Sequence, residues 1–387
     1  MTPVTVLYVD HVTMLSGGER SLLDLVRVLD RTRFSPALVC PGEGPLAAAF
    51  RDAGCAVSFL PDAGGLFSVS RKRLDTGIHR AIQWVPRTLS AARHLAAIAR
   101  ACGARLLASN SQKAHVIASL ASLETGLPLV WHMRDCLDPS PVASLLGLLA
   151  GVTARRVIAI SDAVTRSLAD AGGFPLGRVV RVHNGIDLAR GAGRPVLRAE
   201  LGLPPDAFLA GAVGQLSRWK GAHVLLDAAR AMPSLHVALA GSCLFAGNEA
   251  AYFDELQAAA REPGLRGRVH LLGQRDDVPD VMASLDALVH PAIQPEPFGR
   301  VLVEAMAAGC AVVASDVGAV REVVGDAGAL VPPGDAPALA MRLAALAADP
   351  ARRAALGAAG RARALALFGI DRCRRATEAV YERVLAP

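Results

Sequence analysis

The sequence predicts an α/β protein made of two doubly wound domains, each with a parallel sheet covered by helices. Short β-branched runs alternate with helical patterns along nearly the whole chain, which is typical of βαβ units. The 387 residues, of which 52% are hydrophobic, exceed what one ordinary core accommodates. Residues 187–205 are rich in Gly, Pro and Arg and lack periodicity, which favours a link between two domains.

Thirteen segments have the pattern of short buried strands. They are residues 4–9, 37–40, 56–60, 105–109, 129–132, 157–160 and 179–182 in the first half, and 208–213, 236–240, 269–272, 287–290, 311–314 and 329–331 in the second. From residue 335 the pattern is helical and Ala-rich, ending in 371–384.

These elements suggest a domain plan. We expect residues 1–187 to form an N-terminal Rossmann-like domain, residues 188–205 a linker, and residues 206–368 a C-terminal Rossmann-like domain. A C-terminal helix in 369–387 could pack back on the N-terminal domain. Such sheets bind ligands beyond the carboxyl ends of their strands, so we expect the function in a cleft across which the two domains face.

Composition excludes several classes of protein. The seven Cys residues form no C-x-x-C pair, and their odd number excludes a fully paired disulfide framework, which favours a reducing compartment. The N-terminus lacks the order of a signal peptide, and the longest uncharged run, residues 139–154, is shorter than a membrane helix. We expect a cytoplasmic protein, with peripheral attachment to the inner face of the membrane left open.

The net charge of +6 lies entirely in the first half of the chain. Residues 1–187 hold 20 Lys and Arg against 14 Asp and Glu, whereas the remainder holds 21 of each. Residues 71–105 alone carry eight basic residues and one acid, Asp75. A basic face suits an anionic partner, although a solvated helix face explains any single Arg equally well.

Within this region, Pro86 favours a helix from about residue 86 to 101, preceded by a loop or short helix over 64–85. Segment 64–101, which includes Trp84, is our candidate for a peripheral membrane contact; the alternative is an amphipathic helix packed on its own domain. We expect no nucleic-acid partner, because the chain has neither an RNA-binding motif nor a series of aromatic residues.

Missing motifs narrow the chemistry. The chain has no G-x-x-x-x-G-K-[ST], H-E-x-x-H or G-x-S-x-G motif, which argues against P-loop enzymes, common zinc proteases and α/β-hydrolases. It also lacks Asp-x-Asp, the usual carboxylate pair that holds Mg²⁺ or Mn²⁺ on a nucleotide diphosphate. We therefore expect no metal and no cofactor.

Two loops that lead into helices carry the strongest positive signals. The loop G-Q-L-S-R-W-K-G, from Gly214 to Gly221, offers backbone amides and two cations, Arg218 and Lys220, as phosphate sites do, although exposed turns often look alike. The run E-P-F-G-R-V-L-V-E places Glu296 at a helix mouth and Glu304 about two turns inside. Such a pair could bind hydroxyls of an extended ligand; a helix-capping acid and a solvated residue are the alternatives.

Further candidates lie at the first domain's strand ends. S-G-G-E, with Gly17 and Gly18, opens a helix and would let a ligand approach backbone amides. His132, in W-H-M-R-D, ends a strand on the cleft side, where it could bond a ligand oxygen or be structural. For H-N-G-I-D, residues 183–187, we favour a structural role.

Together these motifs resemble family-4 glycosyltransferases of the GT-B type over essentially the whole chain. In order they are S-G-G-E-R, W-H-M-R-D, S-D-A-V, H-N-G-I-D, G-Q-L-S-R-W-K-G, G-Q-R-D-D-V and E-P-F-G-R-V-L-V-E-A-M-A-A-G. The resemblance implies transfer of a sugar from a nucleotide diphosphate donor, with retention of anomeric configuration and without metal. The acceptor would be a hydroxyl, with a lipid-linked saccharide or polysaccharide favoured and a soluble natural-product aglycone as the alternative.

The resemblance also implies that domain 1–187 binds the acceptor and domain 206–368 the nucleotide sugar, and it assigns roles to residues. Lys220 and a nearby Arg would hold the diphosphate, Glu304 the ribose, and Glu296 a hydroxyl of the transferred sugar, with His132 beside that sugar. The other donor-binding residues implied are Gly17, Gly18, Gln215, Arg275, Val278, Phe298, Gly299, Arg300 and Val301. Gln215 departs from the pattern, since the family usually has Arg there, and we expect Arg218 to compensate.

Two other readings keep the same fold. One is a sugar-nucleotide epimerase or hydrolase, and the other is a non-catalytic, two-lobed protein that binds a sugar nucleotide. A new glycoside, an isomerised donor, free sugar, or binding without turnover would distinguish them.

Overall fold

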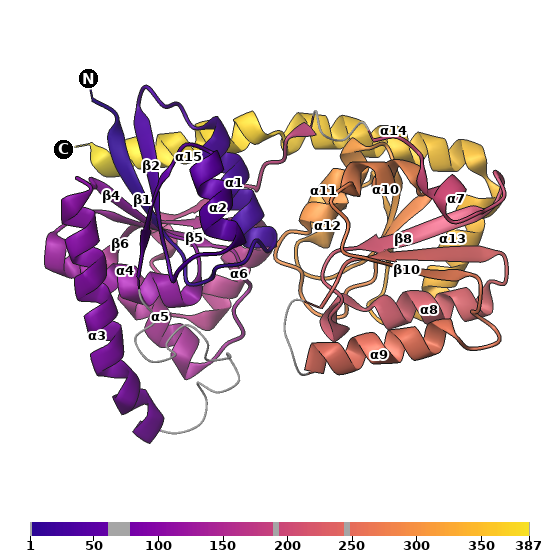
Figure 1. Ribbon diagram of the computed structural model, residues 1–387, viewed down its shortest axis with the longest axis horizontal. Helices are drawn as coiled ribbons and strands as arrows, with labels where there is room; N and C mark the ends of the chain where they lie inside the picture. The colour runs from indigo at the N-terminus through magenta and orange to yellow at the C-terminus, as the bar shows by residue number, and fades with distance from the viewer. Residues whose placement is uncertain (1, 61–77, 189–192, 244–247, 387) are drawn as a thin grey trace. The chain divides into compact units, whose positions relative to one another are not determined.

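The computed structural model describes residues 2–60, 78–188, 193–243 and 248–386. The chain divides into two compact units (Figure 1). Unit 1 comprises Met1–Gly185 and Ile370–Pro387, and unit 2 comprises Ile186–Gly369. All the strands predicted from sequence are present, with ends displaced by at most three residues, and the expected α/β fold class is confirmed.

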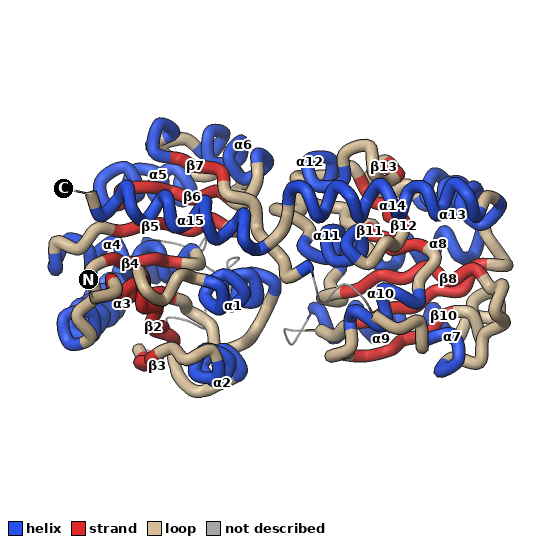
Figure 2. The backbone as a smooth tube through the Cα atoms, turned by 90° about the horizontal axis from the view of Figure 1, so that it is seen from above, coloured by secondary structure: helices blue, strands red, loops and turns tan. Residues whose placement is uncertain are grey.

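Unit 1 is built on a seven-stranded, wholly parallel sheet in the order β3-β2-β1-β4-β5-β6-β7 (Figure 2). Its strands are β1 (Val4–Val9), β2 (Phe34–Cys40), β3 (Ala56–Phe59), β4 (Leu106–Ser109), β5 (Leu129–Met133), β6 (Ala154–Ala159) and β7 (Val179–Arg181). The order reverses between β1 and β4. At such a switch point a crevice opens at the carboxyl ends of the strands.

Helices flank this sheet. They are α1 (Gly17–Val28), α2 (Pro45–Asp52), α3 (Ile78–Ala101), α4 (Gln112–Thr125), α5 (Pro141–Thr153), α6 (Asp162–Ala171) and α15 (Ile370–Leu385). Helix α3 packs against α4 and α4 against α5, whereas α15 packs against α1 (Figure 1). No helix among the described residues combines the length and hydrophobicity needed to cross a bilayer.

The predicted start of one helix near residue 86 is wrong. Helix α3 begins at Ile78 and continues through Pro86. The proline ring removes one backbone donor from the helix, and the turns on both sides nevertheless form. Most of the preceding segment, residues 61–77, lies outside the described residues, so the expectation for 64–85 is tested only from residue 78 onward.

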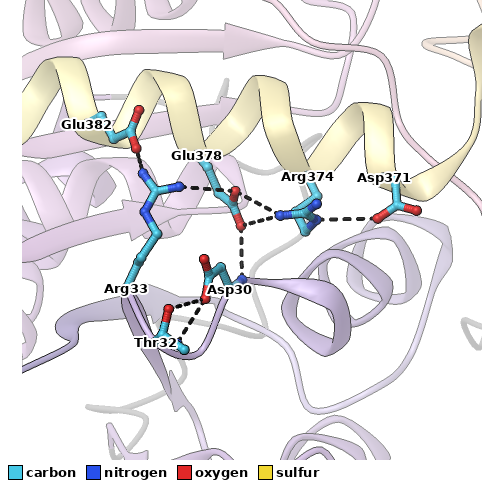
Figure 3. A network of polar contacts seen from close by, with 7 residues as sticks. All are labelled: Asp30, Thr32, Arg33, Asp371, Arg374, Glu378 and Glu382. Atoms are coloured by element: carbon cyan, nitrogen blue, oxygen red, sulfur yellow. Dashed lines mark hydrogen bonds and ion pairs between the residues drawn. The ribbon is translucent and has the colours of Figure 1, made fainter.

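Helix α15 is part of the core of unit 1, although it comes last in the chain. Tyr381 is fully buried and packs edge-on against Phe34, and the hydroxyls of Tyr381 and Tyr8 lie 3.2 Å apart. The buried Glu378 carboxylate accepts the backbone N–H of Asp30 at 2.9 Å (Figure 3).

Two arginines complete this contact. Arg374 Nη1 donates to Glu378 Oε2 at 3.1 Å from the same helix, and Arg33 forms ion pairs with Glu378 and Glu382 (Figure 3). Both ends of the chain therefore fold into one domain.

Unit 2 repeats the plan with a six-stranded parallel sheet in the order β10-β9-β8-β11-β12-β13. Its strands are β8 (Phe208–Val213), β9 (Leu235–Ala240), β10 (Val269–Gly273), β11 (Ala287–His290), β12 (Ala311–Ser315) and β13 (Ala329–Val331). Its helices are α7 (Leu197–Glu200), α8 (Ala222–Ala231), α9 (Asn248–Ala260), α10 (Val278–Ser284), α11 (Arg300–Ala307), α12 (Val320–Val324), α13 (Ala336–Ala348) and α14 (Pro350–Leu367). The switch point here lies between β8 and β11.

The described part of the expected linker, 188–205, packs within unit 2. The backbone N–H of Arg194 donates to Asp280 Oδ1 at 2.8 Å, and that of Leu197 to Ser284 Oγ at 3.0 Å. The Leu197 side chain is fully buried. The chain passes between the units at Gly185–Ile186 and returns at Gly369–Ile370, within two residues of the expected end of the N-terminal domain and start of the C-terminal helix.

Candidate active site

Unit 2 gathers three charged or polar side chains at its switch point. Lys220, in the short 3₁₀ turn that follows β8, places its Nζ 2.6 Å from Glu296 Oε2. His290, the last residue of β11, places its Nε2 3.1 Å from the same oxygen. Glu296 lies in the loop between β11 and α11. The contact thus joins the two loops that the sequence singled out.

The Glu296 carboxylate is buried and ionised. Burial alone would raise its pKa, but the charge of Lys220 and the hydrogen bond with His290 hold the pKa well below its ordinary value. Its other oxygen accepts the backbone N–H of Gly299, the N-cap of α11, at 3.0 Å. The capping role weighed from the sequence is therefore present together with the ion pair.

Two glycines fix this geometry. Gly221 has φ +74°, and a Cβ there would lie 1.9 Å from the carbonyl oxygen of Pro291, so only glycine lets the lysine loop approach the β11 loop. Gly318 has φ +59°, and a Cβ there would lie 2.3 Å from the carbonyl oxygen of Glu296. Gly318, which was not predicted from the sequence, lies in the loop after β12, the strand that pairs with β11.

Arg218 and Gln215 point elsewhere. Arg218 forms an ion pair with Glu255 of α9, and its guanidinium lies 5.0 Å from the ring centre of Tyr252. Gln215 Nε2 donates to Glu249 Oε1 at 2.6 Å. Within the described parts of the chain, neither side chain shares a partner with Lys220. Compensation of Gln215 by Arg218 therefore stays a prediction and requires Arg218 to leave Glu255.

The first turns of α11 hold the second predicted carboxylate. Glu304 Oε1 accepts Arg300 Nε at 2.7 Å, and both side chains are half-buried. Phe298 is buried and packs edge-on against Phe368, while Val301 lies one residue into the helix, half-buried. The backbone amide of Gly299 is used by Glu296, as described above.

The segment expected to border the nucleotide base forms its own cluster. Arg275 donates to Asp277 Oδ1 at 2.8 Å and to Glu200 Oε1 at 2.6 Å. Val278 begins α10. These contacts tie the loop after β10 to α7. They do not bring Arg275 together with Lys220 or Glu296.

Unit 1 contains the other predicted residues. Gly17 and Gly18 open α1; a Cβ on Gly18 would lie 3.3 Å from Cδ of Arg134, whereas a Cβ on Gly17 would meet nothing within 4 Å. His132, near the carboxyl end of β5, is 5% exposed. Burial, followed by the charge of Arg134, holds the pKa of His132 well below its ordinary value, so the imidazole is neutral.

The residues that surround His132 were not predicted from the sequence. The Arg134 guanidinium contacts Asn110 Oδ1 through Nε, Asn184 Oδ1 through Nη1 at 2.9 Å and His132 Nδ1 through Nη2 at 3.2 Å. Asn110 also donates to the buried Asp10 carboxylate at 2.8 Å. Asp10 and Asn110 directly follow β1 and β4, the strands at the switch point, and that position was the available signal.

Asn184 belongs to the H-N-G-I-D motif, for which we favoured a structural role. Its contact with Arg134 joins this motif to W-H-M-R-D at the same edge of the sheet. Across the described residues, no group of three or more His, Cys, Asp or Glu side chains is arranged to hold a metal ion. The charged groups of the two edges are suited to binding anions and hydroxyls.

Both halves of the chain match models of known families. Residues 15–190 match Glycosyltransferase Family 4, and residues 193–363 match Glycosyl transferases group 1. The chain resembles the lipopolysaccharide core biosynthesis mannosyltransferase LpsB of Rhizobium meliloti, at 34% identity over 193 residues, which cover 48% of this chain and 54% of LpsB. The alignment thus spans about half the length of that relative.

Two longer alignments extend the comparison. The D-inositol 3-phosphate glycosyltransferase of Xylanimonas cellulosilytica is 34% identical over 289 residues, 68% of each chain. Anabaena HepE, whose crystal structure holds UDP and glucose, is 28% identical with a TM-score of 0.83 over 97% of this chain and 99% of HepE. Together with the two parallel α/β units, these matches show that the chain belongs to glycosyltransferase family 4 and has the GT-B fold.

Proposed function

We propose that the protein transfers a sugar from a UDP- or GDP-linked donor to a hydroxyl acceptor, with retention of configuration and without a metal. The observation that carries the proposal is the Lys220–Glu296 contact beside the N-terminus of α11 at the switch point of unit 2. A fixed cation and a helix N-terminus favour a diphosphate, and a buried carboxylate accepts hydroxyl donors. The crystal structure of HepE, which contains UDP and glucose, supports this class of donor.

One further atom suits an oxygen-rich ligand. Ser217, which precedes the Lys220 turn, is buried, and its Oγ has no hydrogen-bond partner among the described residues. Buried hydroxyls are usually hydrogen-bonded. A bound diphosphate would supply the acceptor.

The chemistry follows from the charges. As the bond between the anomeric carbon and the phosphate oxygen breaks, positive charge develops on the sugar and negative charge on the diphosphate, which Lys220 and the α11 dipole stabilise. The acceptor oxygen bonds to the same face of the sugar, and its proton passes to the departing phosphate oxygen. In this scheme Glu296 binds a sugar hydroxyl through Oε1, which accepts the backbone N–H of Gly299 and, as a carboxylate oxygen, can accept a second hydrogen bond.

Incubation of the purified chain with UDP- and GDP-sugars and candidate acceptors, followed by mass spectrometry, tests the proposal. We expect a new α- or β-glycoside whose anomeric configuration matches that of the donor. An isomerised donor or free sugar would assign an epimerase or a hydrolase instead. Donor binding without any turnover across the acceptor panel would contradict a transferase.

For the acceptor we propose an anionic or membrane-held saccharide, with a soluble natural-product aglycone as the alternative. The support is the basic composition of residues 71–105 and the exposed side of α3, where Val85 and Leu89 are 56% and 40% exposed. Arg87 lies over the Trp84 ring at 5.1 Å on the same helix. Apolar and cationic side chains on one helix suit an anionic membrane surface. The two relatives described above are named for lipopolysaccharide and inositol phosphate.

Vesicle flotation tests the membrane part of this proposal. We expect the protein to float with vesicles rich in phosphatidylglycerol at low salt and to be released as the ionic strength rises. Equally poor binding to anionic and neutral vesicles would refute it and would favour the soluble acceptor.

A further inference from the structure

The carboxyl edge of unit 1 contains a buried arginine with an unusual set of partners. The Arg134 guanidinium contacts the side chains of Asn110, Asn184 and His132, all of them neutral. Burial lowers the pKa of Arg134, and Glu19 and Asp10 act on it only through longer-range charge. These direct contacts are therefore hydrogen bonds to neutral groups and not ion pairs.

The contact with His132 determines where that imidazole carries its proton. Guanidinium nitrogens donate hydrogen bonds and cannot accept them. Nη2 of Arg134 lies 3.2 Å from Nδ1 of His132, so Nδ1 must present its lone pair. In a neutral imidazole the proton then resides on Nε2. The charges facing the ring, Arg134 and His115, both oppose a second proton.

The proton on Nε2 has no acceptor among the residues that the structure describes. His132 is 5% exposed, and its Nε2 has no hydrogen-bond partner among the described residues. A buried donor without a partner is rare in folded proteins, because losing its hydrogen bonds to water costs about 1–3 kcal/mol. Near the carboxyl end of β5, such a donor suits a ligand oxygen.

We propose that Arg134 is a positioning residue that fixes His132 as the neutral Nε2–H tautomer, so that this N–H donates to an oxygen of the bound sugar. Asn110 and Asn184 hold the guanidinium on two sides and thereby fix its direction toward Nδ1. The role in sugar binding rests on the proposed function. The tautomer does not, and it can be measured in the free protein.

The first experiment is nitrogen–proton NMR of the full chain with isotope-labelled histidine, the His132 signal being assigned from its loss in His132→Gln. We expect the pattern of a neutral Nε2–H ring that does not titrate between about pH 6 and 8. An Nδ1–H ring, or an imidazolium in that range, would overturn the proposal whether or not the protein transfers sugar. A correct tautomer in a protein without transferase activity would instead count against the proposed function.

The second experiment separates positioning from a general structural role. Arg134→Met should lower kcat by about 10- to 100-fold, as outer residues that orient a histidine ligand do. In the His132→Gln background Arg134→Met should lower kcat by less than about twofold, because the imidazole through which Arg134 acts is absent. Equal losses in both backgrounds would overturn the proposal. Arg178→Met is the control: this arginine binds the carbonyl oxygens of Gly151 and Ala154, and its kcat should be unchanged.

If Arg134→Met does not fold, a third comparison, between Arg134→Lys and Arg134→Gln, tests the same proposal. Lysine at this position can only donate, whereas glutamine can also accept a proton from Nδ1. Arg134→Lys should therefore keep the Nε2–H tautomer and a higher kcat than Arg134→Gln. If Arg134→Gln matches or exceeds Arg134→Lys, the proposal fails.

Discussion

If Lys220 binds a diphosphate, its ammonium group interacts with two anionic groups, the diphosphate and the Glu296 carboxylate. In the structure its ammonium already contacts Glu296 and lies 4.1 Å from the ring centre of Trp219. These partners hold the cation in place before any ligand arrives, which lowers the cost of ordering it. Arg218, two residues earlier, is held by Glu255 instead.

We expect Lys220→Ala to lower kcat by about 100-fold or more, because its charge is needed most as the diphosphate departs. Arg218 provides a second test. If Arg218 joins the diphosphate, Arg218→Ala should lower activity, and Glu255→Gln, which releases the arginine, should not. If both variants behave like the wild type in steady-state kinetics, Arg218 belongs to the contact with α9, and the expected compensation for Gln215 is wrong.

Gly318 is predicted to act on the site through the backbone of Glu296. Gly318→Ala adds a Cβ 2.3 Å from a carbonyl oxygen that cannot rotate away, whereas Gly334→Ala, at φ +75°, meets nothing within 4 Å. Gly334→Ala should lose about 1 kcal/mol of unfolding free energy through the left-handed backbone, and Gly318→Ala should lose more, because the clash adds to that cost. Only Gly318→Ala should also lose activity. Melting temperatures and kcat of the pair check this, and equal kcat would contradict it.

At the scale of elements, α15 is predicted to be required for unit 1 to fold. Tyr381→Ala leaves a cavity beside Phe34 and removes the contact with Tyr8, which should cost about 3–5 kcal/mol in urea unfolding. Arg372→Ala, on the exposed side of the same helix, should change stability by less than about 0.5 kcal/mol. Similar losses in both variants would show that α15 contributes propensity and not packing.

The strands could be predicted because each is a short β-branched run between turns. A parallel strand that is buried on both faces is a continuous hydrophobic segment, which is visible in the sequence without knowledge of the neighbouring strands. The start of helix α3 was predicted wrongly because the prediction rested on Pro86 alone. Packing of α3 against α4 favours one continuous helix through this proline. The expected linker was less apparent, since Leu197 is buried in unit 2 through tertiary contacts that composition does not reveal.

The candidate site was predictable where its residues are close in sequence. Glu296 and Gly299 lie in one motif, and their hydrogen bond is local. Arg134 and Asn184 are fifty residues apart, and only the order of the sheet brings them together. Hydrophobic periodicity predicts which segments form strands. The order of the strands, which determines the residues that share an edge, is a property of the folded sheet.

In the molecule as a whole, the two units share one sheet architecture but surround their cations with different partners. Each has a parallel sheet whose switch point gathers polar side chains from separate strands. Unit 1 places the buried Arg134 among neutral acceptors, and unit 2 places Lys220 against a carboxylate. In both, the cation is fixed by protein contacts, so the molecule carries its own counter-charge for an anionic substrate.

From these fixed cations we predict that transfer does not depend on a divalent ion. Protein treated with EDTA should keep its rate within about twofold of that with added Mg²⁺, because Lys220 and the N-terminus of α11 already oppose the charge of the leaving diphosphate. Added Mg²⁺ should not restore Lys220→Ala, since the described residues offer no group of three or more carboxylate, His or Cys ligands to bind it there. Loss of transfer in EDTA and recovery with Mg²⁺ or Mn²⁺ would mean that a metal carries the charge assigned to Lys220.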